Sequence, residues 1–178
     1  MSNPTNRNQP KVMPSKDDIV YVAGLLDGEG CISIVKCIRG KNWTPQYQLL
    51  VSIGMTYLPL GEWLKDRFGG SCFLRQQKGN RKPNFDWQIC ANQALGFLEL
   101  VSPYLQVKKR EADFAIAYQT QKRKNPHTKG NRGGRGRSFM PPERVRLMEE
   151  AQQYLRSLKH NSPGGIRCPN INSVNLKQ

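Results

Sequence analysis

The sequence is poor in acidic residues and in histidine. Its 178 residues include 13 Asp and Glu against 28 Lys and Arg, which gives a formal net charge of +15, and only two histidines. His127 and His160 both lie in polar stretches, so we do not expect a histidine general base or a histidine-rich metal site. Because so large an excess of positive charge repels itself, the composition indicates a polyanionic partner, and nucleic acid above all.

Long apolar runs and paired cysteines are also missing. No stretch reaches the roughly 18 apolar residues of a membrane span, and none is long and basic enough for a membrane-surface helix. The five cysteines lack the paired spacing of structural zinc sites, so we expect reduced thiols rather than a disulfide framework. Residues 1–14 lack an apolar segment, which predicts a disordered leader rather than a signal peptide.

The most informative segment is Val22 to Gly30, where two carboxylates lie between small residues. The apolar residues before it recur at helical spacing, and Ser15 with Asp18 forms a capping box. These patterns predict a helix over residues 16–27. We expect the glycines on either side of Glu29 to turn the chain out of the helix. The Glu29 carboxylate would then lie at the negative end of the helix dipole, where it needs a cation.

Taken by itself, this segment is either half of a close helix pair or an amphipathic helix with a glycine-rich cap. It resembles the LAGLIDADG motif of homing endonucleases, with Val22 at the first Leu, Gly28 at the penultimate Ala and Glu29 at the second Asp. The resemblance implies that two such helices pack side by side. It also implies that Glu29 holds the divalent metal that cleaves DNA, and that the Gly28 carbonyl lies beside this metal.

The motif also predicts an interface between two copies of the chain. Ala23 and Gly24 lack the bulk that keeps helices apart, and the resemblance implies a structural role for Asp27 at the helix end. We assign these three residues to the interface. One chain supplies one catalytic site and a double-strand break needs two, so we expect an isologous homodimer. Mg²⁺ suits an oxygen-only site, with Ca²⁺ or Mn²⁺ able to replace it in binding.

Short alternating strands and amphipathic helices fill the rest of the core. Strands are predicted at 32–38, 46–55, 71–77 and 85–91, and the first has Ile38 on its apolar face. Further helices are predicted with Thr56 and Asn92 as their N-caps, and a third begins at Lys109. The resulting αββαββα order predicts an α+β fold with an antiparallel, saddle-shaped, DNA-binding sheet covered on one face. This order is similar to the core fold of the family, so the resemblance covers residues 15–122.

Three segments follow this core. Residues 123–140 form a basic Gly/Arg-rich arm, because Lys122 to Arg137 holds seven Lys or Arg and no acidic residue and cannot bury enough apolar surface to order itself. Residues 141–160 form a C-terminal helix, whose apolar stripe would dock on the core. Residues 161–178 are rich in Pro, Gly and Asn and predict a loose tail.

Lys108 is a second catalytic candidate. Family members are similar to the stretch from Leu105 to Arg110 and place an active-site lysine there, which implies that Lys108 stabilises developing charge on the phosphate. Taken alone, the residues equally allow a phosphate clamp or a solvated helix start. The sequence departs from better-known relatives at Tyr57 and Gly61, where those relatives carry polar or basic residues. Either Thr56 and Tyr57 line the site in another way, or water fills it.

DNA recognition is expected on the open face of the sheet, because a two-stranded ribbon fits the major groove. Alternation away from the apolar face selects Ser33, Val35, Cys37, Gln46, Gln48, Leu50, Ser52, Arg75, Gln77, Asp86 and Gln88. Basic residues in or near loops should contact phosphates, namely Lys36, Arg39, Lys41, Lys78, Arg81 and Lys82. Each polar strand residue alone fits an ordinary solvated face; together with the basic loops the set favours DNA.

These observations favour a homodimeric, Mg²⁺-dependent, site-specific DNA endonuclease, similar to intron-encoded homing enzymes, that cuts a long near-palindromic site. The alternative is an RNA maturase or a DNA-binding regulator with the same fold. A single-strand or RNA chaperone is disfavoured, because Phe73 alone offers a stacking platform on the predicted sheet face. We expect double-stranded DNA and a second copy as partners and no small-molecule substrate. The expected location is intracellular, including a mitochondrion or chloroplast for an organelle intron product.

Overall fold

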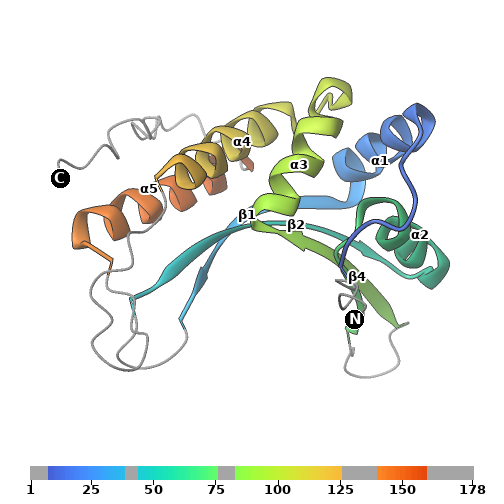
Figure 1. The fold of residues 1–178 in the computed structure, drawn as a ribbon, viewed down its shortest axis with the longest axis horizontal. Coiled ribbons are helices and arrows are strands. Elements are labelled where there is room, and N and C mark those ends of the chain that lie inside the picture. The colour runs from blue at the N-terminus through green and yellow to red at the C-terminus, as the bar shows by residue number, and fades with distance from the viewer. Residues whose placement is uncertain (1–7, 39–43, 76–82, 126–139, 160–178) are drawn as a thin grey trace, which may run out of the picture.

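The computed structural model describes residues 8–38, 44–75, 83–125 and 140–159, which form a helical layer over one antiparallel sheet (Figure 1). The motif helix leads directly into the first strand. In chain order the elements are α1 (Lys16–Glu29), β1 (Gly30–Cys37), β2 (Gln46–Met55), α2 (Leu58–Phe68), β3 (Ser71–Arg75), β4 (Asn84–Cys90), α3 (Ala91–Val101), a 3-10 turn (Ser102–Tyr104), α4 (Lys109–Lys124) and α5 (Pro142–Lys159).

The four strands form one sheet in the order β1-β2-β4-β3, with every neighbouring pair antiparallel. Ser33 pairs with Leu50, and Ser52 pairs with Gln88, which sets the register across the centre of the sheet. The sheet arches, and the helices cover its convex side (Figure 1). The predicted α+β fold is therefore confirmed. We call the concave side, away from the helices, the open face.

Alternation along the strands separates the two faces. On β2, Leu49, Val51 and Ile53 are fully buried against the helices, whereas Gln48 and Ser52 are half-buried on the open face. Burial of each such aliphatic side chain contributes roughly 1.5 to 3 kcal/mol, so a register slip by one residue would be strongly unfavourable. The apolar pattern in the sequence thus fixes which side chains face away from the helices.

Helix α1 begins as predicted but ends later. Ser15 Oγ accepts the Asp18 N–H at 3.2 Å, and the Asp18 carboxylate accepts the Ser15 N–H at 2.9 Å. The helix continues through Gly28 to Glu29, so the prediction that Gly28 turns the chain out is wrong. The chain leaves at Gly30 in an ordinary extended conformation. A Cβ at Gly30 would lie 2.3 Å from the Leu26 side chain, which is why this junction needs glycine.

Three smaller predictions are also wrong. Helix α2 has Tyr57 as its N-cap rather than Thr56, with no side-chain cap. Helix α3 begins at Ala91, so Asn92 lies inside its first turn, where its side chain accepts a hydrogen bond from Gln119 at 3.1 Å. Ile38 is 64% exposed, because strand pairing ends at Cys37.

The described end of the leader is held against the core. Gly70 N–H donates to the Asn8 carbonyl at 2.9 Å, and the N–H groups of Lys11 and Val12 donate to the Asp66 carbonyl at 2.7 and 3.1 Å. The prediction of a disordered leader is therefore wrong for residues 8–12, whose order depends on backbone hydrogen bonds that composition does not reveal.

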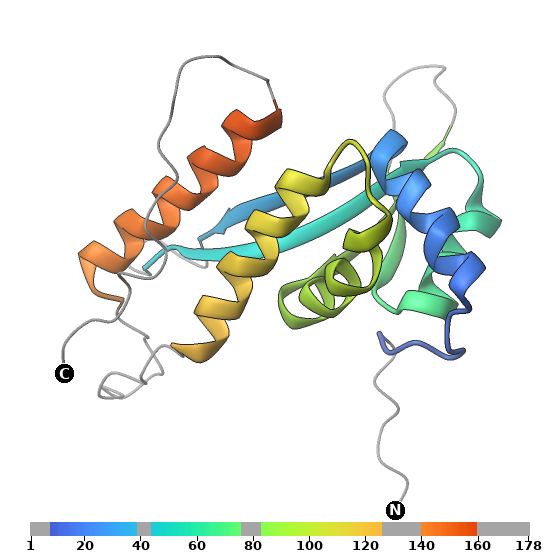
Figure 2. The ribbon, with the colours of Figure 1, turned by 90° about the horizontal axis from the view of Figure 1, so that it is seen from above.

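Helix α5 docks on the core through the predicted stripe. Met148, Ala151 and Leu155 are buried, and α5 runs alongside β1 (Figure 2). The basic arm beyond residue 125 and the tail from residue 160 lie outside the described residues. In the described ranges, no helix is long and apolar enough to cross a membrane. The four cysteines found there are free thiols.

Candidate active site and nucleic-acid interface

The two sides of the motif helix have different environments. Ala23 is fully buried in the core of its own chain, so the prediction that it forms the interface between copies is wrong. Gly24 and Gly28 lie on the exposed side, and a Cβ at either would meet no described atom within 4 Å outside its own stretch of helix. Val20 and Tyr21 on this helix are 45% and 54% exposed. The exposed side therefore combines two glycines with two apolar side chains.

The Asp27 carboxylate ties the end of α1 to the turn before α4. It accepts the backbone N–H groups of Gln106, Val107 and Lys108 at 2.7, 3.2 and 2.9 Å. Partial burial acts to raise the pKa of Asp27, but these three donors and the Lys108 charge together lower it below its usual value. The carboxylate therefore has a structural role at the helix end, as expected, and its contact with a second copy stays a prediction.

Lys108 is held beside the same helix end. It is the N-cap residue of α4, and its ammonium donates to the backbone carbonyl of Asp27. The side chain is half-buried, which limits its freedom. Because an ammonium has three donors, two remain for a bound anion. The fold thus brings Lys108 to a point two residues from Glu29, although the two lie far apart in the sequence.

Glu29 is the last residue of α1 and is exposed, as is Gly28 before it. A carboxylate and a backbone carbonyl are the hard oxygen donors that Mg²⁺ prefers. Within the described ranges, no group of three or more His, Cys, Asp and Glu side chains could hold a metal ion. The donor chemistry fits the implied metal, but the described residues of one chain supply too few ligands. Further oxygens would have to come from DNA phosphates, water or a second copy.

The site also contains a buried carboxylate that the sequence did not single out. Glu111, in the first turn of α4, is 9% exposed, and its Oε2 accepts no hydrogen bond from the described residues. Burial raises its pKa; the charges of Lys159 and Lys108 act in the opposite direction, and that of Asp27 adds to the rise. The spacing from Lys108 to Glu111 places both on one side of α4 and was the available signal.

Lys159, at the end of α5, is a second residue that sequence reasoning missed. Its ammonium lies 3.0 Å from the Cys31 thiol, near the start of β1. The two residues are 128 positions apart, so no local pattern could have revealed their contact.

The register places most predicted DNA contacts together on the open face. Half-buried residues of β1 and β2 line this face, with Val35 opposite Gln48 and Ser33 opposite Leu50. Phe73 lies there too and is 44% exposed. The predicted residues found on the open face are Ser33, Val35, Cys37, Gln46, Gln48, Leu50, Ser52, Arg75, Asp86 and Gln88. Lys36 lies on β1 but points toward α5. The other six, Arg39, Lys41, Gln77, Lys78, Arg81 and Lys82, lie outside the described residues.

Two predicted contacts have partners within the chain. Asp86 is only 5% exposed and forms an ion pair with Arg75 at 2.5 Å, so the prediction of a solvent-facing Asp86 is wrong. Lys36 belongs to β1 rather than to a loop, and its ammonium lies 3.1 Å from the Glu149 carboxylate of α5. Arg75 itself is 59% exposed and stays accessible.

Tyr57 and Gly61, where the sequence departs from better-known relatives, have different environments. Tyr57 is 66% exposed, whereas Gly61 is buried. A Cβ at Gly61 would lie 2.5 Å from the Cys72 sulfur. Position 61 therefore has no room for a long polar side chain, and this part of α2 packs on β3.

Comparison with known proteins shows what this geometry is similar to. No family model matches the sequence, and no curated protein matches it. Among solved structures, the homing endonuclease I-CvuI, in complex with a DNA target, is similar with a TM-score of 0.59 and 15% identity, over 89% of this chain and 92% of that one. This chain has the homing-endonuclease fold. The core fold that the resemblance implied is thereby confirmed.

Two further structures share the homing-endonuclease fold. The archaeal intron-encoded homing endonuclease I-Vdi141I, complexed with DNA, has a TM-score of 0.55 and 16% identity, over 90% of this chain and 94% of that one. I-SmaMI, bound to an uncleaved DNA target with calcium ions, has a TM-score of 0.56 and 18% identity. The match covers 90% of this chain but only 53% of I-SmaMI, so this chain spans about half of that protein.

Proposed function

We propose that this chain is a site-specific DNA endonuclease of the LAGLIDADG class. It acts as a homodimer, requires Mg²⁺, cuts a long near-palindromic target and is encoded within an intron. One observation carries the proposal. The hydrogen bonds between Asp27 and Lys108 hold Lys108 at the end of α1, where Glu29 is exposed. DNA complexes of I-CvuI and I-Vdi141I, which share the fold, support DNA as the substrate.

Each residue of the site has a distinct role. The Glu29 carboxylate and the Gly28 carbonyl would hold the divalent ion, which when bound supplies Lewis-acid stabilisation and an activated water. The Lys108 ammonium is held in place by its hydrogen bond to the Asp27 carbonyl. Its other N–H groups donate hydrogen bonds to a phosphate oxygen and stabilise the negative charge there. Asp27 positions Lys108 beside the end of α1, where Gly28 and Glu29 lie. The open face binds the duplex and carries the sequence preference.

The homodimer follows from the number of sites and from the exposed side of α1. One chain carries one Glu29, whereas cutting both strands needs two such sites. Gly24 and Gly28 leave space for a second helix, and Val20 and Tyr21 would be removed from water by it. A two-fold axis beside Gly24 would bring the two Glu29 residues together. The match to half of the longer I-SmaMI chain supports a working unit made of two such folds.

Cleavage by variants tests the catalytic assignment. A target is first selected from a randomised duplex library by cutting in Mg²⁺. Glu29→Gln and Lys108→Met should each abolish cutting while the duplex is still bound. Lys109→Met is the matched control, because its ammonium is already bound to Asp113 at 2.8 Å, and it should still cut. A Glu29→Gln variant that cuts at the wild-type rate would contradict the proposal.

Binding without cutting would favour the alternative. If the wild-type chain binds duplex DNA but does not cut in Mg²⁺ or Mn²⁺, it is a DNA-binding regulator; if it prefers a structured RNA, it is a maturase. Metal binding has an independent readout. Ca²⁺ should raise the melting temperature of the wild type but not of Glu29→Gln, because a ligand that binds only the folded state stabilises it.

A further inference from the structure

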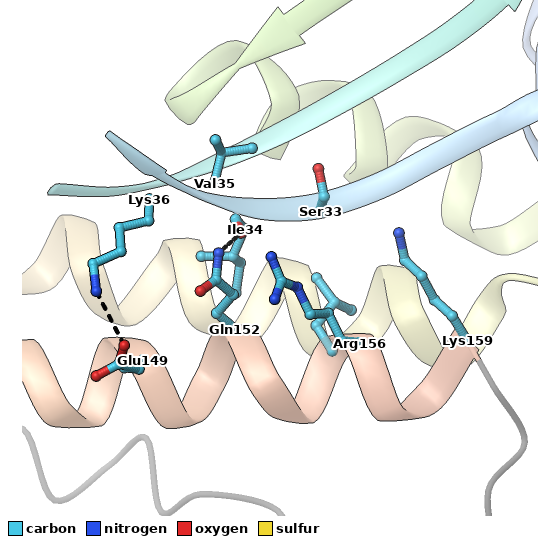
Figure 3. Close-up of a pocket in the computed structure, with 9 residues that line it drawn as sticks. Ser33, Ile34, Val35, Lys36, Glu149, Gln152, Arg156 and Lys159 are labelled. Carbon is cyan, nitrogen blue, oxygen red and sulfur yellow. Dashed lines mark hydrogen bonds and ion pairs between the residues drawn. The ribbon is translucent and has the colours of Figure 1, made fainter. Parts of the chain in front are cut away.

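A basic cleft separates the edge strand β1 from α5 (Figure 3). Its volume is about 570 Å³. Polar side chains of both elements line it, chiefly Ser33, Lys36, Glu149, Gln152, Arg156 and Lys159. The sequence predicted only that α5 docks on the core. The charged side chains of α5 that face β1 have no role in the proposed function.

Buried contacts between α5 and β1 fix the shape of the cleft. The buried side-chain amide of Gln152 donates to the backbone carbonyl of Ile34 at 2.6 Å, and Leu155 beside it is 1% exposed. These contacts set the spacing between α5 and β1 and use an edge-strand carbonyl that would otherwise lack a partner. Arg156 and Lys159 follow on the same helix and point from it toward β1 (Figure 3).

The charge in the cleft is only partly compensated. Lys36 is paired with Glu149, the one carboxylate among the described residues that line the cleft. Within the described part of the chain, Arg156 makes no hydrogen bond or ion pair, and the hydrogen-bond partner of Lys159 is the Cys31 sulfur. Neither cation is therefore in an ion pair among the described residues, although Lys159 lies near enough to the buried Glu111 carboxyl for its charge to act there. This excess of positive charge favours an anionic ligand.

The cleft meets the open face at its Lys159 end. Cys31 pairs with Ser52, which places it on the open face, and it lies two residues beyond Glu29. Ser33 and Val35 point to the open face, whereas Lys36 points toward α5 (Figure 3). A nucleic-acid strand on the open face that follows the β1 edge would thus pass the cleft on its way to Glu29.

We propose that this cleft between β1 and α5 binds backbone phosphates of duplex DNA, with Arg156 and Lys159 as the phosphate ligands. The inference rests on the proposed function and extends it to α5. Guanidinium and ammonium groups are the donors that phosphates prefer, and they carry no base preference. Glu149 limits the affinity, because it neutralises Lys36 and adds negative charge beside the phosphates.

The salt dependence of binding tests this proposal. The full-length wild type and variants are titrated with a random-sequence DNA duplex in Ca²⁺ over a range of salt concentrations. Each phosphate contact contributes about 0.9 to the slope of log affinity against log salt. The double variant Arg156→Gln/Lys159→Gln should therefore lose about 2 from this slope. Arg146→Gln is the matched control on the same helix, outside the cleft and paired with Glu150, and should keep the slope.

A gain-of-affinity variant excludes misfolding as an explanation. Glu149→Gln removes the carboxylate and releases Lys36, so it should bind the duplex more tightly and with a steeper slope. If Arg156→Gln/Lys159→Gln and Glu149→Gln both keep the wild-type slope of log affinity against log salt, the proposal is overturned. It is also overturned if the double variant loses affinity for single-stranded RNA but not for duplex DNA. If the wild type does not bind duplex DNA, the proposed function itself fails. If the wild type binds and the cleft variants match it, only the cleft assignment fails.

Discussion

The Asp27 carboxylate accepts the backbone N–H of Lys108 at 2.9 Å and so joins two residues that are 81 positions apart. The two further backbone donors, from Gln106 and Val107, make this a nest for one carboxylate. The nest explains how the end of α1 and the start of α4 keep a fixed relation beside Glu29. In the proposed endonuclease, Asp27 would act on the site through Lys108 rather than by contact with a substrate.

Replacing Asp27 by Asn should destabilise the fold at neutral pH. An amide cannot accept all three N–H groups as a carboxylate does, and hydrogen bonds to a charged group contribute about 1.5 to 3 kcal/mol. The folded-state pKa of Asp27 lies below the unfolded one, so its contribution is present above the unfolded pKa and is lost as pH falls through the folded pKa. Urea unfolding at neutral and acidic pH measures the difference.

The exposed Glu99 provides the control for that comparison. Glu99→Gln should leave the free energy of unfolding nearly unchanged at either pH. The difference in free energy of unfolding between the wild type and Asp27→Asn should become smaller on acidification. A difference that does not change with pH would mean that the shape of the Asp27 side chain, rather than its charge, holds the turn.

The sequence predicted the elements of this site better than their connections. Periodicity and the Ser15 capping box located α1 and the four strands, because these signals are local, whereas the family resemblance singled out Lys108. The contacts of Asp27 with residues 106–108, of Arg75 with Asp86 and of Lys159 with Cys31 depend on tertiary packing. The described members of the open-face set lie on that face by register, but alternation alone could not show that Arg75 forms an ion pair with the Asp86 carboxylate.

Glu111 should make stability fall as pH rises. Its folded-state pKa is raised, mainly by burial, above an unfolded value of about 4.3. The folded state therefore holds the proton more tightly, and ionisation costs stability as pH rises from the unfolded pKa through the folded one. Glu111→Gln removes this cost. Its melting temperature should exceed that of the wild type at neutral pH and match it at acidic pH, as measured by calorimetry.

The exposed Glu62 serves as the comparison, and Glu62→Gln should show no such pH-dependent gain. If Glu111→Gln is instead less stable than the wild type at neutral pH, the Glu111 carboxylate is stabilised by Lys108 and Lys159 more than burial penalises it.

The Arg75–Asp86 pair should couple stability to DNA affinity. Arg75→Ala leaves the buried carboxylate without its cation, at a cost of about 1 kcal/mol, since Arg75 is more than half exposed and water screens the pair. Asp86→Asn instead releases the guanidinium, so duplex affinity should rise. Chemical denaturation and salt-dependent binding measure the two effects. Equal affinity of Asp86→Asn and wild type would show that Arg75 contacts no DNA.

Gly24 should control assembly without affecting the fold of a single chain. A Cβ at Gly24 would meet no atom of the described residues within 4 Å beyond its own stretch of helix, and alanine in a helix interior is more stable than glycine by roughly 0.5 to 1 kcal/mol. Gly24→Leu should therefore fold at least as well as the wild type. Its bulk would separate two packed motif helices, so sedimentation should give a monomer and cutting of both strands should be lost.

Gly96 in α3 is the matched control, since it is also helical and a Cβ there would also meet nothing within 4 Å. Gly96→Leu should keep the sedimentation coefficient of the wild type. A dimer that persists in Gly24→Leu would move the two-fold axis away from Gly24. Since Glu29 lies on the same helix, the two metal positions would then no longer meet beside that axis, and the double-strand break would need another arrangement of the two chains.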